Sequence, residues 1–157
     1  MPTPTVVRRR LVSPDPATTR AIGAALAAAA RPGDIVCLRG DLGAGKTQLA
    51  KGYAAGLGVA ATVTSPSFVL MAEYDGRLPL FHIDLYRLAD AVDAIAAGLF
   101  DERQAAGVTL VEWPERLGSA LPRARLDVVF HGTGDEPRTI DVDALSAGYV
   151  RYLEVLP

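Results

Sequence analysis

The segment "GDLGAGKT", residues 40–47, constrains this chain more than any other feature. It fits the pattern G-x-x-x-x-G-K-[ST]. It lies between an apolar, β-branched run that predicts a buried strand, Ile35–Arg39, and a run that predicts a helix, Thr47–Leu57. The glycines allow backbone N–H groups to turn towards phosphate oxygens, and the helix directs its positive end to the same place. The segment therefore predicts a phosphate-binding loop in an α/β fold.

Two carboxylates stand at the ends of further predicted strands. Asp84 ends the run Leu80–Asp84, and Glu112 lies near the end of Val108–Trp113. In an open parallel sheet the carboxyl ends of the strands gather on the side of the phosphate loop. Hydrolysis or phosphoryl transfer needs a carboxylate there to hold magnesium or its water. The spacing alone does not rank the two residues for that role.

His82 and Trp113 are neighbours of these carboxylates in the sequence. His82 falls on the same side of a regular strand as Asp84, and we expect a hydrogen-bonded structural histidine in preference to a catalytic one. Trp113 follows Glu112 directly. Either it packs in the core or it forms a partly exposed platform for a nucleotide or a partner, and the residues alone leave that choice open.

The remaining segments complete an α/β pattern. Ser13–Ala30 predicts a helix capped by Ser13, and Ala91–Gln104 predicts another helix, broken near Gly98. Val63–Tyr74 begins as a loop and becomes extended. Three C-terminal segments alternate in part and predict short antiparallel strands: "RLDVVF", "RTIDVDAL" and "YVRYLEVL".

The order of these elements predicts a single domain, residues 1–157, because no repeat or long linker interrupts them. We expect a three-layer P-loop NTPase fold in which antiparallel C-terminal strands extend a parallel core sheet. The formal net charge of −2 offers no basic excess for tight, unaided binding to nucleic acid. The lone cysteine, Cys37, and the lack of an apolar run long enough to span a membrane predict a cytoplasmic protein.

Four segments in this order, "GDLGAGKT", "SPSF", "HIDLYRL" and "VEWPERL", resemble the TsaE family, and the resemblance runs from about Val12 to Val142. The last two segments discriminate far better than the phosphate loop. Members of that family are bacterial P-loop ATPases needed for the threonylcarbamoyl modification of adenosine 37 in tRNAs that read codons beginning with A. The resemblance implies ATP and Mg²⁺ as cofactors and slow hydrolysis that partners stimulate. It also implies the TsaD and TsaB proteins as partners, with tRNA contacted only through that complex.

The resemblance also assigns roles to residues. It implies that Asp84 and Lys46 act in hydrolysis, with Asp84 near the γ-phosphate or its attacking water, and that Thr47 and Glu112 bind magnesium. Trp113 is expected beside the nucleotide site. The residues expected to wrap the phosphates are Asp41, Leu42, Gly43, Ala44, Gly45, Lys46 and Thr47. The expected adenine contacts are Ser13, Asp15 and Arg138, and the expected switch-like residues are Ser65, Ser67 and Phe68.

The chain departs from the family pattern in two places. Many relatives have threonine where this chain has Ser67, and an acidic, helix-forming stretch where it has "ADAVDAIAAGLF". The first change keeps a hydroxyl group, and the second bears on a partner-facing surface.

Two other functions stay open. A small P-loop kinase would need several arginines in a lid to clamp the transferred group, but only Arg87 and Arg103 lie between Asp84 and Glu112. A nucleotide-dependent assembly module without significant catalysis is the remaining possibility.

Overall fold

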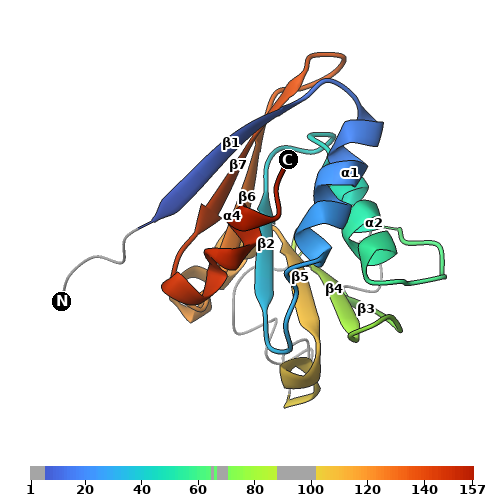
Figure 1. Ribbon diagram of the computed structural model, residues 1–157, viewed down its shortest axis with the longest axis vertical. Helices are drawn as coiled ribbons and strands as arrows, with labels where there is room; N and C mark the ends of the chain where they lie inside the picture. Colours follow the sequence, from blue (N-terminus) through green and yellow to red (C-terminus); the bar gives the residue numbers. More distant parts are fainter. Residues whose placement is uncertain (1–5, 65, 67–70, 88–101) are drawn as a thin grey trace.

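A seven-stranded mixed sheet organises the computed structural model, which describes residues 6–64, 66, 71–87 and 102–157 (Figure 1). The strands lie in the order β1-β7-β6-β2-β5-β4-β3. Their bounds are Val7–Ser13 for β1, Ile35–Arg39 for β2, Met71–Tyr74 for β3, Leu80–Asp84 for β4, Val108–Glu112 for β5, Leu126–His131 for β6 and Arg138–Ala144 for β7. The α-helices are α1, Pro16–Ala27, α2, Lys46–Gly56, and α4, Arg151–Glu154. The 3₁₀ helices are η1, Glu102–Ala106, η2, Pro114–Ala120, and η3, Ala147–Tyr149.

The central strands β6, β2, β5 and β4 run parallel, whereas β7, β1 and β3 are antiparallel to their neighbours. Every residue of β4 and β5 is buried. Their mainly apolar sequences favour this burial, since a central parallel strand is covered on both faces. Because the strands are parallel, the carboxyl ends of β4 and β5 meet at one edge, where Asp84 lies opposite Glu112 in the ladder.

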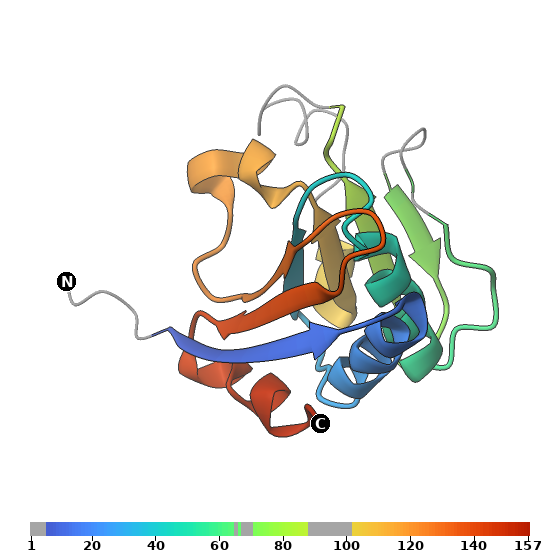
Figure 2. The ribbon, with the colours of Figure 1, turned by 90° about the horizontal axis from the view of Figure 1, so that it is seen from above.

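Apolar side chains cover both faces of the sheet. Helices α1, α2 and α4 lie over one face, and η2 lies over the other (Figures 1 and 2). On the helical face, Leu38 and Leu110 belong to the same buried cluster as Tyr53 of α2. On the opposite face, Cys37 and Val111 cluster with Leu117 of η2. Successive residues of β2 and β5 thus point to opposite layers, as the alternation along a strand requires.

Helices α1 and α2 are in close contact. A Cβ atom added at Gly52 would lie 1.9 Å from the backbone oxygen of Arg20, so only glycine permits this approach. The packing of α2 on α1 holds the helix that begins directly after the phosphate loop.

The N-terminal segment differs from its prediction. The sequence predicts no strand before Ser13, but Ser13 is the last residue of β1 rather than the cap of a helix. Helix α1 begins at Pro16, and its cap is Asp15, whose carboxylate accepts a hydrogen bond of 2.7 Å from the backbone N–H of Thr18. Proline and an acidic cap are both favourable at this point, so the helix starts later than predicted.

The C-terminal segment also differs from its prediction. "YVRYLEVL" forms part of η3 and α4 instead of a strand. Tyr149, Tyr152 and Leu153 are buried with helical spacing, and the hydroxyl of Tyr152 donates a hydrogen bond of 2.7 Å to the buried carboxylate of Asp34. Strand β6 is antiparallel to β7 but parallel to β2, so the antiparallel part of the sheet begins one strand later than expected.

Elsewhere the predicted elements are confirmed with small changes of boundary. Strands β2 and β4 have the predicted limits, β5 ends one residue early, and α2 is shifted by one residue from Thr47–Leu57. Most of the predicted helix Ala91–Gln104 lies outside the described residues. Within the described part of the chain, no helix is long and apolar enough to cross a membrane.

Candidate nucleotide-binding site

The phosphate loop, residues 40–45, connects β2 to the first residue of α2. Gly45 stands just before the helix with a φ angle of 112°, and Gly43 has a φ angle of 79°, so both adopt conformations that favour glycine. Because α2 begins at Lys46, the unpaired N–H groups of its first turn and the positive end of its dipole face the loop. An anion such as phosphate binds well at this kind of helix terminus.

Lys46 is buried at the base of the loop. Its Nζ atom donates a hydrogen bond of 2.6 Å to the carbonyl oxygen of Gly40 and lies 3.9 Å from the centroid of the Trp113 ring. Burial lowers the pKa of the Lys46 ammonium group, and the nearby carboxylates of Glu112 and Asp84 oppose that shift. The cation is therefore held among a carbonyl, an aromatic ring and two acidic groups.

A cavity of about 400 Å³ opens beside Lys46 at the carboxyl ends of β4 and β5. We call it the phosphate pocket. Its lining consists of Leu42, Gly43, Gly45, Lys46, Thr47, Gln48, Asp84, Tyr86, Glu112 and Trp113. The structure thus brings together both predicted carboxylates, the predicted lysine and the predicted threonine in one cavity.

The two carboxylates have different partners. Asp84 is 5% exposed, and its Oδ1 atom accepts a hydrogen bond of 2.9 Å from the backbone N–H of Tyr86. Glu112 is 3% exposed, and its Oε2 atom accepts a hydrogen bond of 2.7 Å from Nε2 of His82. Each carboxylate is thus oriented by a contact with the protein at the edge of the pocket.

His82 is completely buried, and the prediction of a hydrogen-bonded histidine is confirmed. Its Nε2 atom contacts Glu112, so the neutral ring with its proton on Nε2 satisfies that contact. Its Nδ1 atom is the buried side-chain nitrogen for which the described residues supply no hydrogen-bond partner. The ring therefore acts on Glu112 and not on the open part of the pocket.

Trp113 has an unusual backbone conformation. Its φ and ψ angles are 59° and 49°, and it is the only non-glycine residue with a positive φ angle in the described part of the chain. Such a conformation costs roughly 1–2 kcal/mol and is concentrated at functional sites. The ring packs against Tyr86 with centroids 4.9 Å apart, stays partly exposed and covers Lys46. The side chain thus packs and also lines the pocket, and its contact with a nucleotide or a partner stays a prediction.

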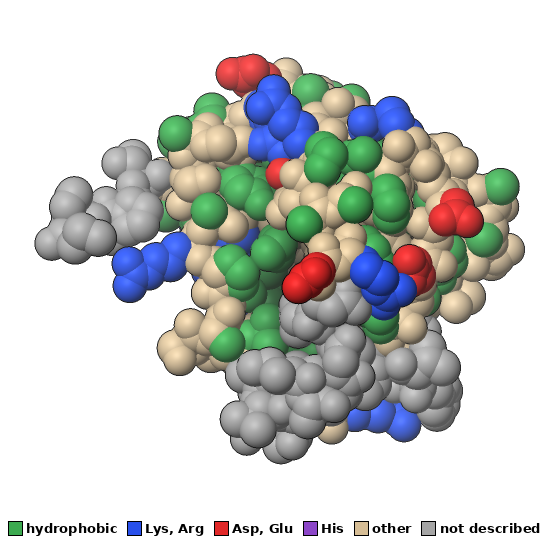
Figure 3. All heavy atoms as spheres, turned by 90° about the horizontal axis from the view of Figure 1, so that it is seen from below, with side chains coloured by type: hydrophobic (Ala, Val, Ile, Leu, Met, Phe, Trp, Pro, Cys, Tyr) green, Lys and Arg blue, Asp and Glu red, His purple; other side chains and the backbone are tan. Residues whose placement is uncertain are grey.

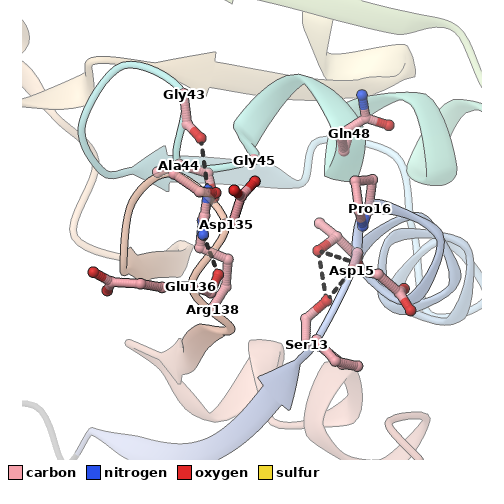
Figure 4. A pocket seen from close by; sticks show the side chains of 13 residues that line it. Ser13, Asp15, Pro16, Gly43, Ala44, Gly45, Gln48, Asp135, Glu136 and Arg138 are labelled. Atoms are coloured by element: carbon pink, nitrogen blue, oxygen red, sulfur yellow. Dashed lines mark hydrogen bonds between the residues drawn. The ribbon is translucent and has the colours of Figure 1, made fainter.

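A second cavity of about 370 Å³ lies on the other side of the phosphate loop (Figure 4). We call it the hairpin pocket, because the turn between β6 and β7 forms one wall and the junction of β1 with α1 forms the other. The lining residues are Ser13, Pro14, Asp15, Pro16, Thr19, Gly43, Ala44, Gly45, Gln48, Gly134, Asp135, Glu136 and Arg138. The three residues predicted to contact adenine, which are distant in sequence, all line this cavity.

Those three residues are engaged in contacts with the protein itself. Ser13 is buried, and its hydroxyl donates a hydrogen bond of 2.9 Å to the carbonyl of Asp15 and bonds the hydroxyl of Thr19 at 2.7 Å. The Asp15 carboxylate caps α1. Arg138 donates hydrogen bonds to backbone carbonyls of the phosphate loop and of the hairpin.

Some predicted residues lie elsewhere, and some lining residues were not predicted. Asp41 is exposed and lines neither pocket, and Ser65, Ser67 and Phe68 lie outside the described residues. Tyr86, Gln48 and the hairpin residues 134–136 were missed. The glycine-rich, acidic turn "HGTGDEP" between two predicted strands was the available signal for the hairpin.

The oxygen atoms of the phosphate pocket fit magnesium. Among the described residues there is no group of three or more His, Cys, Asp or Glu side chains that could hold a metal ion by itself. Thr47, which carries a hydroxyl group, does line the same cavity as Glu112 and Asp84. Magnesium in nucleotide sites uses this arrangement, because it takes one or two protein carboxylates and completes its shell with substrate phosphates and water.

Comparison with known proteins identifies the family. The family described as "Threonylcarbamoyl adenosine biosynthesis protein TsaE" matches residues 13–140 of the chain. This chain belongs to the TsaE family. The tRNA threonylcarbamoyladenosine biosynthesis protein TsaE of Bacillus subtilis is 43% identical over 143 residues, which cover 90% of this chain and 89% of that protein. The protein of the same name from Treponema pallidum is 43% identical over 110 residues, which cover 70% of this chain and 82% of that protein.

A solved structure of similar fold agrees with this membership. The crystal structure of YdiB from Bacillus subtilis superposes with a TM-score of 0.80 and 38% sequence identity, and the match covers 96% of this chain and 94% of YdiB. The expected fold class, a parallel core sheet extended by antiparallel strands, is confirmed. Membership in the TsaE family, together with the observed loop, makes this chain a P-loop nucleotide-binding protein.

Proposed function

We propose that the protein is a magnesium-dependent ATPase that assists the threonylcarbamoyl modification of adenosine 37 in tRNA. One observation carries the proposal: Lys46, Asp84 and Glu112 are buried together around the phosphate pocket, beside the start of α2. A site that only bound nucleotide would need the loop and the lysine, but it would not need two buried carboxylates beside the loop.

Each residue has a distinct task in this proposal. The N–H groups of the loop and Lys46 would bind the β and γ phosphates, and Thr47 and Glu112 would hold Mg²⁺. When bound, the ion neutralises charge that develops on the phosphates. Asp84 accepts a hydrogen bond from the attacking water and orients it towards the γ-phosphorus. Trp113 covers the site, which keeps Lys46 away from bulk water.

The hairpin pocket is the proposed site of the adenosine part of ATP. It shares Gly43 and Gly45 with the phosphate pocket, so a nucleotide whose phosphates lie along the loop can place its nucleoside there. The turn between β6 and β7 and the start of α1 would enclose the base.

We also propose that the protein acts on a complex of TsaD and TsaB, with ATP binding favouring assembly and hydrolysis resetting the complex. The tRNA would then be bound by the partners. The net charge of −2 supports binding of the tRNA by the partners, because this chain has no excess of positive charge for the phosphate backbone. On the face shown in Figure 3, Lys and Arg side chains lie in separate places among acidic and apolar ones instead of forming one basic patch.

Steady-state ATP turnover tests this function. Turnover by the full chain is measured alone and after addition of a purified TsaD–TsaB pair, with Mg²⁺ present. A clear rise in rate on mixing is expected, and Lys46→Ala should show no rise. Unchanged turnover together with no association between the proteins would rule out the proposed role.

The structure gives little support to a small-molecule kinase. Arg103 forms an ion pair of 3.2 Å with Glu73, and neither Arg103 nor Arg87 lines the phosphate pocket. A kinase of this size would be expected to direct such arginines at the transferred phosphoryl group.

A further inference from the structure

We propose that Arg138 is a positioning residue of the phosphate loop, which it joins to the β6–β7 hairpin, and that it does not read the base. The inference rests on the proposed binding of ATP. It replaces the adenine contact that the sequence comparison implied for Arg138 with an indirect role in binding the phosphates.

The guanidinium group of Arg138 lies between two segments that are about 90 residues apart in the chain (Figure 4). On the side of the loop, Nε donates a hydrogen bond of 3.0 Å to the carbonyl of Ala44, and Nη2 donates one of 3.1 Å to the carbonyl of Gly43. On the side of the hairpin, Nη2 donates a hydrogen bond of 3.0 Å to the carbonyl of Gly134, and Nη1 donates to that of Glu136. Each of the three nitrogens therefore has a backbone carbonyl as partner.

This use of its nitrogens argues against contact with the base. A guanidinium group has five N–H donors in one planar fork. The hydrogen bonds to the loop and the hairpin occupy donors on every nitrogen and fix the plane of the group. Reading a base edge would require Arg138 to give up contacts that close the wall of the hairpin pocket.

Holding carbonyl oxygens of the loop determines where its N–H groups point. In a trans peptide the C=O and the N–H that follows it point in opposite directions. The structure contains no cis peptide bonds among its described residues. The contact between Arg138 and the carbonyl of Ala44 therefore turns the N–H of Gly45 away from the guanidinium group. A loop that binds phosphate depends on the direction of these N–H groups, so Arg138 acts on phosphate affinity without touching phosphate.

The apolar underside of the loop is supported from the same hairpin. Phe130 of β6 is buried, and a Cβ atom added at Gly45 would lie 3.7 Å from its ring. Strand β6 thus packs beneath the loop while Arg138, the first residue of β7, holds its carbonyls. The hairpin and the loop form one unit, joined by an apolar contact and a set of charge-assisted hydrogen bonds.

The test compares affinity for ATP with affinity for inorganic tripolyphosphate, measured by calorimetry on the full chain. Arg138→Met should weaken both ligands by the same factor, about tenfold, because the loop that binds the phosphates is disturbed in each case. Arg138→Lys should remain weakened, since one ammonium group keeps the charge but cannot hold carbonyls on both sides. Arg10→Met is the matched control, because Arg10 pairs with Asp141 of β7 and lines neither pocket.

The possible outcomes separate the readings. If Arg138→Met weakens ATP but leaves tripolyphosphate unchanged, Arg138 contacts the nucleoside and the inference is wrong. If Arg138→Lys restores both affinities, charge alone explains the effect, and the positioning role is also excluded. Unaltered circular dichroism of the Lys variant shows that the fold survives. Failure of the unmodified protein to bind ATP would count against the proposed function and not against Arg138 in particular.

Discussion

The phosphate pocket and the hairpin pocket share Gly43, Gly45 and Gln48, yet they are built in different ways. The phosphate pocket lies at the ends of adjacent parallel strands, and its charged side chains are buried. The hairpin pocket lies between the start of α1 and the β6–β7 turn, and its acidic side chains, Asp15, Asp135 and Glu136, are exposed. In the proposed function, the chemistry would take place where the parallel core ends, and the added antiparallel strands would provide support and a wall for the nucleoside.

The largest effect is expected in the phosphate pocket, from Lys46→Ala. Removing the buried ammonium group should lower ATP affinity by about 100-fold, because no other cation lies at the base of the loop in the described residues to meet the phosphates. Calorimetry measures the change, and circular dichroism checks the fold. Lys51→Ala is the control, since Lys51 is also on α2 but lies outside both pockets. Equal losses in the two variants would contradict the special role of Lys46.

A smaller effect is expected from the residues around the proposed magnesium ligand. Glu112→Gln keeps an oxygen that can accept from His82 but loses the charge. It should raise the magnesium concentration needed for half-maximal ATP turnover by roughly 10–100-fold. His82→Leu should raise it by about tenfold, because Glu112 loses its orienting contact.

His82→Gln is the matched control for His82→Leu, because the amide N–H of glutamine can still donate to Glu112. The magnesium concentration for half-maximal turnover should therefore stay close to that of the unmodified protein. Nucleotide affinity without magnesium should be unchanged in all three variants. If His82→Leu weakens nucleotide binding by the same factor with and without magnesium, His82 supports the fold alone and does not orient Glu112.

The smallest effect is expected at the hairpin pocket, from loss of the α1 cap. Asp15→Ala should lower the melting temperature at pH 7 by about 2–4 °C. The hydrogen bond from the Thr18 N–H lowers the pKa of Asp15 from its ordinary value of 3.8, so folding favours the ionised carboxylate. The stabilisation is present above pH 3.8 and is lost as the pH falls through the lower pKa of the folded state.

Thermal melting of the unmodified protein and of Asp15→Ala across that range measures this loss. The difference between the unmodified protein and Asp15→Ala should shrink at the acid end, towards the constant difference that Asp15→Asn, which caps without a charge, shows from Asp15→Ala. A difference between the unmodified protein and Asp15→Ala that stays the same at every pH would show that the charge of the carboxylate does not stabilise the fold.

The elements around the phosphate pocket could be predicted from the sequence, whereas β1, next to the hairpin pocket, could not. Strands β2, β4 and β5 are short, mainly apolar segments bounded by turns, and the phosphate loop is a local motif. A short window of sequence therefore identifies each of them and places Asp84 and Glu112 at strand ends. Strand β1 has no such signal. It contains three consecutive arginines, residues 8–10, and it pairs with β7 through ion pairs, such as Arg8 with Asp143, that only the folded chain brings together.

The C-terminal tail was mispredicted for a different reason. The apolar residues of "YVRYLEVL" fit both a partly alternating strand and one face of a short helix. The segment forms a helix because Tyr152 and Leu153 are then buried in the core. In addition, Arg9 of β1 donates hydrogen bonds to the carbonyls of Leu153 and Leu156 near the end of this helix. The positioning contacts of Arg138 are non-local in the same way, so no pattern near residue 138 could have predicted them.

Asp84→Asn in a reconstituted modification reaction tests whether the buried carboxylates make this a site of hydrolysis. The asparagine keeps the oxygen that accepts from the Tyr86 N–H, so the local turn survives while the charge is lost. With TsaD, TsaB, tRNA and ATP present, the unmodified protein should support repeated cycles of threonylcarbamoyl transfer. Asp84→Asn should bind ATP and join the complex, but hydrolysis and repeated cycles should stop. Continued cycles at the unmodified rate would contradict the account and identify the protein as an assembly module that needs nucleotide binding alone.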